Sequence, residues 1–147
     1  MIIRLTVYES KKYNKVEIII NCPEVDHQLG RLIDQINQMG ITLTGTKDDK
    51  IYSLVPEHVY YIESIDNQTF IYEEKEVYRS QMKLYEFEQL VKDTPFTRIS
   101  KNLIVNTTHI ASVRALLNGK FEASLSNDEK VIVNRHYVKT FRKKFLS

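Results

Sequence analysis

The sequence has little cysteine and little glycine, and it contains no long apolar run. Cys22 is the one cysteine, so the chain can form no intramolecular disulfide and offers no cysteine-based zinc pattern. The four glycines are scattered, so there is no glycine-rich loop to hold a phosphate. Charged residues, Arg4 and Glu9 first among them, interrupt the N-terminal stretch, and no apolar run approaches membrane-spanning length. We therefore expect a cytoplasmic protein.

Patterns typical of catalysis or metal binding are also missing. None of the four histidines pairs with another at the spacing of metal ligands. Glu73 and Glu74 fall where an expected strand ends, which suits a solvated edge better than an acid–base pair. No serine or cysteine nucleophile motif is present. We expect no enzyme activity, no catalytic residue, no bound metal and no cofactor.

Charge is unevenly distributed along the chain. The formal net charge is +2, but residues 94–147 contain ten Lys and Arg against three Asp and Glu. Residues 1–93 contain eleven basic and sixteen acidic residues. A basic pole on an acidic body suits a polyanionic partner. A solvated basic helix without a partner explains the same asymmetry equally well.

Residues 1–47 predict a small strand–strand–helix extension. Apolar residues alternate over 2–8 and recur over 16–20, which is typical of strands. After Pro23, apolar residues recur at helical spacing as far as Met39. The polar stretch 44–50 is the best linker candidate. Because such a unit is small for an independent core, we expect it to self-associate or to pack on the main domain.

Residues 48–147 predict a mainly β (α+β) domain of short antiparallel strands. Apolar segments separated by turn residues recur at regular spacing along this part of the chain. Leu84, Phe87 and Leu90 mark one helix, with Ser80 as its expected cap. A last helix, opened by Asn134, places Val138 and Phe141 on one face and basic residues on another.

An ordered set of residues in this domain resembles the LytTR family of bacterial DNA-binding domains. The segment 96–106 reads Phe-Thr-Arg-Ile-Ser-Lys-Asn-Leu-Ile-Val-Asn, and Asn-Arg-His-Tyr follows at 134–137. Ser100, Asn102 and Asn134 depart from the family pattern but remain small or polar. The positions that match it are Arg98, Lys101, Ile104, Val105, Asn106, Ile110, Gly119, Arg135 and Tyr137.

The resemblance implies about ten short strands, one or two helices, and the reading of duplex DNA through loops and strand ends in two successive major grooves. Lys101 and Asn102 in one loop and Arg135 at the start of the last helix would read bases. The turn at Asn67, Gln68 and Thr69 is a third candidate. Phosphate contacts would come from the last helix, at Lys139, Arg142 and Lys143.

Four of these residues have structural alternatives. Lys101, in a loop, can be merely solvated. Arg98 can pair with a carboxylate of the helix at 84–92 as well as touch DNA. Asn106 suits a turn that bonds its own backbone. Arg135 can pair with Asp128 or Glu129, but the helix dipole disfavours a cation at its position, which favours a function there.

Family members often carry a receiver domain, and 47 residues are too few for one, so the resemblance implies a stand-alone regulator. It also implies duplex DNA and a small membrane regulatory protein as partners. A homodimer is expected from the packing of residues 1–47. Two other functions stay open: a protein–protein interaction module with an incidental basic surface, and a single-stranded RNA binder. The aromatic residues that could stack on RNA bases are Tyr60, Tyr61, Phe70, Tyr72 and Tyr78.

Overall fold

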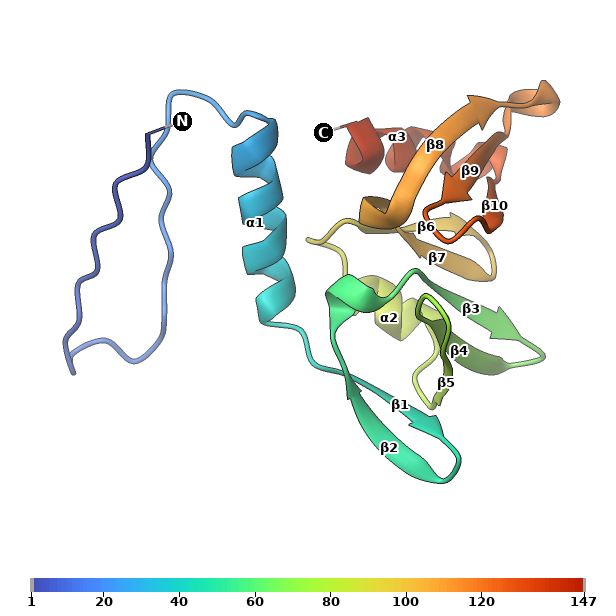
Figure 1. Ribbon diagram of the computed structural model, residues 1–147, viewed down its shortest axis with the longest axis horizontal. Coiled ribbons are helices and arrows are strands. Elements are labelled where there is room, and N and C mark those ends of the chain that lie inside the picture. The colour runs from blue at the N-terminus through green and yellow to red at the C-terminus, as the bar shows by residue number, and fades with distance from the viewer. Residues whose placement is uncertain (1, 147) are drawn as a thin grey trace.

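The computed structural model describes residues 2–146, and Figure 1 shows the arrangement of their helices and strands. The strands are β1 (Leu43–Lys47), β2 (Lys50–Leu54), β3 (Tyr61–Ile65), β4 (Gln68–Tyr72), β5 (Val77–Ser80), β6 (Phe96–Ser100), β7 (Leu103–Asn106), β8 (Ile110–Ala115), β9 (Phe121–Leu125) and β10 (Lys130–Val133). The α-helices are α1 (His27–Met39), α2 (Leu84–Leu90) and α3 (Val138–Leu146). Short 3₁₀ turns are η1 (Pro56–His58), η2 (Thr107–His109), η3 (Leu117–Gly119) and η4 (Arg135–Tyr137). This content confirms the expected mainly β class.

Two antiparallel sheets organise the domain. Seven strands form one sheet in the order β2-β1-β5-β4-β3-β7-β6, and β10-β9-β8 form the other. One apolar core, with Phe87 of α2 and Phe96 of β6 fully buried, lies between the larger sheet and α2. A second core joins the smaller sheet to α3 through Phe141. Strand β6 contacts both α3 and β10, so it links the two cores.

The two strands expected at 2–8 and 16–20 do not form. Residues 2–26 contain no strand, and every one of these residues is exposed. Figure 1 shows them as two extended legs on the far side of α1 from the sheets. An isolated two-stranded hairpin is marginal in water, and no third strand or core covers these legs. The expected helix is confirmed as α1, where the Asp26 carboxylate accepts a hydrogen bond from the Leu29 amide at 2.8 Å.

The linker expected at 44–50 is also wrong, because β1 and β2 form a hairpin there. Asp48 and Asp49 make its turn, with φ of 51° and 62°. Thr46 of β1 also pairs with Arg79 of β5, which places the hairpin in the larger sheet. A boundary after residue 47 would therefore cut a strand from that sheet.

The sequence predicted where α2 and the last helix lie, but not the residues that cap their N-termini. Ser80 is not the cap of α2: Lys83 holds that position, and its amide donates to the Glu86 side chain at 3.0 Å. Asn134 precedes the final helical segment, but its side chain makes no capping bond. Within residues 2–146, no helix is long and apolar enough to span a bilayer.

Asn106 ties three elements together in the interior. Its side chain is fully buried, and Nδ2 donates to the Val59 carbonyl at 3.0 Å. Its Oδ1 accepts from the Thr108 amide at 3.2 Å and from the Thr108 hydroxyl at 2.7 Å. These bonds agree with the turn interpretation of Asn106 and leave no surface from which it could reach DNA.

Replacing this buried amide should destabilise the fold. Because Asn106→Ala leaves the buried Val59 carbonyl unpaired, we expect a loss of about 1–3 kcal/mol in the free energy of unfolding. Urea denaturation measures it, with Asn102→Ala as the matched exposed control, which should change stability by less than about 0.5 kcal/mol. Equal losses for the two variants would contradict the structural role of Asn106.

Candidate nucleic-acid interface

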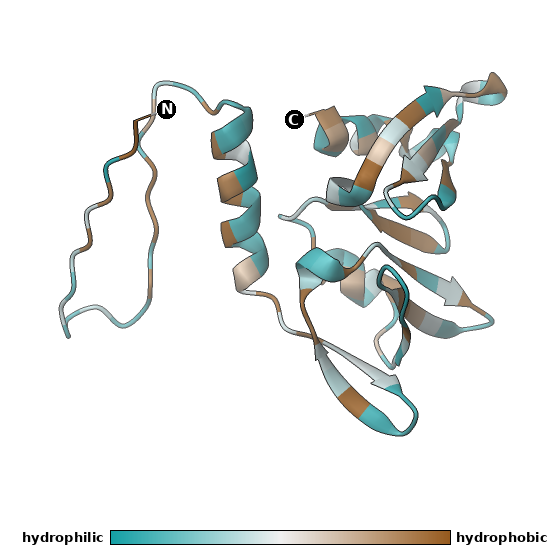
Figure 2. Ribbon diagram, viewed as in Figure 1, coloured by the Kyte–Doolittle hydropathy of each residue, from teal (hydrophilic) through white to brown (hydrophobic). Residues whose placement is uncertain are grey.

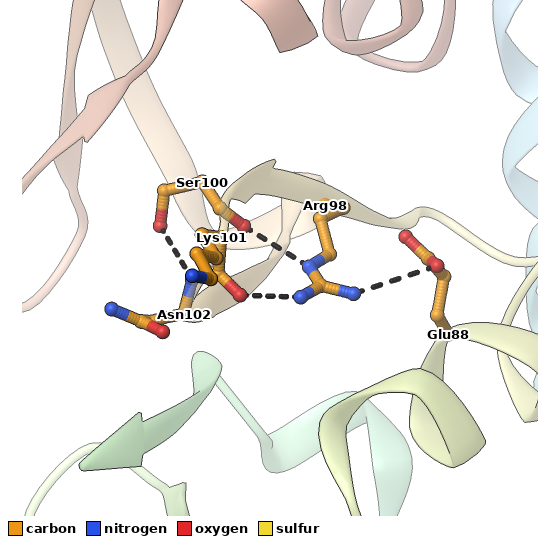
Figure 3. Close-up of polar contacts among 5 residues, drawn as sticks. All are labelled: Glu88, Arg98, Ser100, Lys101 and Asn102. Carbon is orange, nitrogen blue, oxygen red and sulfur yellow. Dashed lines mark hydrogen bonds and ion pairs between the residues drawn. The ribbon is translucent and has the colours of Figure 1, made fainter. Parts of the chain in front are cut away.

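The β6–β7 turn is held by Arg98, as Figure 3 shows. Its Nε donates to the Ser100 carbonyl at 3.0 Å, and a terminal nitrogen donates to the Lys101 carbonyl. The other terminal nitrogen lies 3.5 Å from a carboxylate oxygen of Glu88 in α2. The alternative of a carboxylate partner on this helix is therefore confirmed for Arg98. Its guanidinium is committed to shaping the turn.

Lys101 and Asn102 form the exposed tip of this turn. The Ser100 hydroxyl accepts from the Asn102 amide at 3.2 Å, so the backbone of the tip is fixed. Figure 3 shows the Asn102 side chain pointing away from Arg98. Both side chains are thus presented to solvent on a braced backbone, which suits contact with a base edge or a phosphate.

Removing the brace should loosen the turn. Arg98→Ala deletes the hydrogen bonds to two carbonyls of the turn and the ion pair to Glu88. We expect faster amide exchange at Lys101 and Asn102 and an about three- to tenfold loss of duplex affinity, because each lost bond is worth about 0.5–1.5 kcal/mol. Glu88→Gln is the control and should have a smaller effect, since this carboxylate is partly exposed. Unchanged exchange in Arg98→Ala would show that the turn does not need its brace.

The β3–β4 turn lies beside the β6–β7 turn. The Ser64 amide donates to the Asn102 carbonyl at 2.8 Å, which joins the end of β3 to that tip. Asn67 and Gln68 are exposed there. The carboxylate of Asp66 at the same turn disfavours a phosphate, so a base edge is the better fit.

Thr69 does not belong to this surface. It is only 3% exposed, because strand alternation turns its side chain inward between Ser64 of β3 and Ser80 of β5. We therefore exclude Thr69 from the candidate interface.

Arg135 is exposed and opens η4, which leads directly into α3. The amide of the preceding Asn134 donates to the Ile99 carbonyl at 2.9 Å, so Arg135 follows a point fixed to the end of β6. Among the described residues, no carboxylate forms an ion pair with Arg135. The pairing with Asp128 or Glu129 that the sequence left open does not form.

Gly119 shapes the seat of the Arg135 side chain. A Cβ atom on Gly119 would lie 2.9 Å from Cδ and 3.1 Å from Cγ of Arg135, so only a glycine lets this stem lie so close. Gly119 also has a φ of +75°, which other residues rarely adopt. The aliphatic part of the Arg135 side chain therefore packs against the η3 turn, and this contact positions its guanidinium.

Basic side chains surround two shallow hollows next to Arg135. One hollow, of about 440 Å³, is lined by Gly119, Arg135, Val138, Lys139, Arg142 and Lys143. The other is lined by Asn118, Lys120, Arg135 and His136. No acidic side chain lines either of them. We call the basic side chains that line these hollows, Lys120, Arg135, Lys139, Arg142 and Lys143, the basic face.

Lys120 and His136 were missed by the sequence analysis. Lys120 follows the Gly119 turn and lies far from α3 in the sequence, so only the folded chain places it beside Arg135. Lys144 is not part of the basic face. Its ammonium donates to the Lys92 carbonyl at 2.9 Å and to the Phe96 carbonyl, and burial lowers its pKa. This lysine anchors α3 instead.

The aromatic residues considered for RNA stacking are mostly engaged within the fold. Tyr60 stacks on His109 with ring centroids 4.0 Å apart, and Tyr61 stacks on Tyr72 at 4.3 Å. Tyr78 is buried. These rings are not arranged as a platform for unpaired bases.

A family model described as the LytTr DNA-binding domain matches residues 49–146. The chain is 32% identical over 97 residues to the sensory transduction protein LytT of Enterococcus faecalis, covering 66% of this chain and 40% of that protein. It is 30% identical over 95 residues to the transcriptional regulatory protein LytR of Staphylococcus aureus, covering 65% and 39%. The chain thus matches about 40% of the length of these curated relatives.

A solved structure matches the same part of the fold. The LytTr DNA-binding domain of a methyl-accepting/DNA response regulator from Bacillus cereus aligns with a TM-score of 0.65 and 31% sequence identity. The alignment covers 70% of this chain and 94% of that domain. The strands and helices that carry the basic face therefore follow the architecture of that domain.

Proposed function

Because this chain belongs to the LytTR family of DNA-binding domains, we propose that it is a sequence-specific transcription regulator that reads duplex DNA through loops and strand ends. The observation that carries the proposal is the basic face, whose Arg135 has no carboxylate partner among the described residues. A planar guanidinium with free donors suits the O6 and N7 acceptors of guanine in the major groove. If the protein were an interaction module with an incidental basic surface, nothing would require the basic side chains to gather around an unpaired Arg135.

The residues of the interface would divide into two roles. Arg135 and the tip at Lys101 and Asn102 would contact base edges, with Asn67 and Gln68 as an adjacent reading turn. The last helix would supply phosphate contacts through Lys139, Arg142 and Lys143. Phosphate contacts fix the orientation of the domain on the duplex, whereas base contacts select the sequence.

The wider setting follows from the same proposal. A regulator of this kind works on DNA in the cytoplasm and catalyses no reaction. A second copy or a small membrane regulatory protein would bind away from the basic face, and the N-terminal extension before β1 offers exposed apolar residues for such a contact.

Fluorescence anisotropy with labelled duplexes and single strands tests the proposal. At low salt the full chain should bind duplex DNA at least about tenfold more tightly than a single strand of the same sequence, because the reading loops need a major groove. Equal affinity for both, or no duplex binding, would contradict the proposed function.

A further inference from the structure

The turn between β8 and β9, residues 116–120, has a fixed backbone. The Leu116 amide donates to the Lys120 carbonyl at 2.8 Å, which closes the turn. Within it Asn118 has a φ of 71° and a ψ of 17°, and Gly119 has a φ of +75°, so two successive residues are left-handed. Figure 2 shows this turn projecting at the edge of the molecule, on the side away from α1. Asn118 is therefore held out on a closed turn.

The side-chain amide of Asn118 takes no part in holding this turn. It is exposed, and among the described residues it forms no hydrogen bond. Asn127 in the β9–β10 turn differs, because its Oδ1 accepts from the Glu129 amide at 3.2 Å and stabilises its own turn. The positive φ at position 118 requires a residue such as glycine or asparagine, but it gives no role to the amide.

Asn118 lies beside Arg135 in the fold. Both side chains line the second hollow, together with Lys120 and His136. The residue after Asn118 is Gly119, where a Cβ atom would lie 2.9 Å from Cδ of Arg135, so packing ties the turn to the Arg135 side chain. No acidic side chain lines this hollow, so a polyanion can approach Asn118 and Arg135 together without repulsion.

We propose that Asn118 is a further specificity-determining residue, which reads an adenine in the same block of the binding site as the guanine read by Arg135. This proposal rests on the proposed function, because it needs Arg135 in the major groove. A carboxamide offers both donors and an acceptor, and it can bond N6 and N7 of adenine at the same time. Two side chains of one hollow then select two different bases.

The neighbouring residues favour a base edge over a phosphate as the partner of Asn118. Lys120 follows in the same turn and supplies the charge that suits a phosphate. An amide on a phosphate would use only its donors and leave its acceptor oxygen without a partner. An adenine edge satisfies a donor and the acceptor together, which is the arrangement that carries sequence information.

Selection from a pool of randomised duplexes by the full chain, repeated with Asn118→Gly, tests the proposal. Glycine tolerates the positive φ, so the turn and the melting temperature should be retained. The variant should still enrich the guanine read by Arg135, but it should lose a conserved adenine in the same block. By fluorescence anisotropy, its affinity for the duplex that the wild type selects should fall about 5- to 150-fold, and its affinity for the starting pool much less.

Asn127→Gly is the matched control. It makes the same substitution in the turn at the other end of β9, outside the residues that line the hollows. This variant should select the same sequence as the wild type, with the adenine included.

Retention of the adenine by Asn118→Gly would overturn the proposal. Equal losses on the selected duplex and the starting pool would also overturn it, because they would mark Asn118 as a phosphate contact. So would loss of the adenine in Asn127→Gly as well. A wild-type chain that enriches no sequence would contradict the proposed function itself, whereas a wild-type site with the guanine and no adenine in its block would contradict this inference alone.

Discussion

Raising the salt concentration from 50 to 200 mM should weaken duplex binding by about 1,000-fold. The five side chains of the basic face and Lys101 of the β6–β7 turn offer six cations, and neutralising about six phosphates gives a slope near −5 for log K against log salt. Each phosphate contact releases condensed counterions, and added salt opposes that release. Fluorescence anisotropy over a series of salt concentrations measures the slope.

Lys143→Ala is the matched variant for the salt series. Lys143 is exposed at the rim of the hollow next to Arg135, so its loss should weaken all duplexes alike and reduce the slope by about one. Lys130→Ala serves as a control because this exposed lysine lies outside the residues that line the hollows. A flat response to salt in the wild type would remove the basic face as a phosphate-binding surface.

Arg135→Ala should lower affinity for the cognate duplex by about 5- to 150-fold, equivalent to about 1–3 kcal/mol for one bidentate base contact. It should lower affinity for an unrelated duplex much less, because a base contact adds little to non-specific binding. Arg135→Lys should not restore the cognate affinity, since an ammonium lacks the planar fork of donors. Anisotropy with both duplexes gives the ratio.

Thermal stability is the control for Arg135. Its guanidinium has no ion pair among the described residues, so the alanine variant should melt close to the wild type. Equal losses of affinity on cognate and unrelated duplexes would remove Arg135 from the base-reading residues and leave it as a phosphate contact.

The strands of the domain were predictable because alternation and turn residues are local signals. The prediction of strands in the N-terminal legs was wrong for the same reason. Alternation over 2–8 marks an amphipathic segment, but it does not reveal whether a partner strand exists. The hairpin at 44–50 was missed because its turn places Asp48 and Asp49 at positive φ, without the glycine that usually follows Asn or Asp in such a turn.

The candidate site was predictable where a family pattern covers it and less so where packing decides. Lys101 and Arg135 match that pattern, and both are exposed. The hydrogen bond from the Asn134 amide to the Ile99 carbonyl joins the segment before Arg135 to the segment before Lys101. Thr69 was misplaced because a shift of one position along a strand turns a side chain from solvent to core. The partner of Arg98 became certain only once α2 was placed against the turn.

Selection from a pool of randomised duplexes by the full chain tests the central claim most directly. Sequence-specific reading predicts enrichment of one sequence with two conserved blocks about one helical turn apart, as expected for contacts in two successive major grooves. In a parallel selection with Arg135→Ala, one block should lose its conserved guanine. A pool that stays random after repeated rounds, at a salt concentration where the chain still binds duplex, would contradict sequence-specific regulation by this protein.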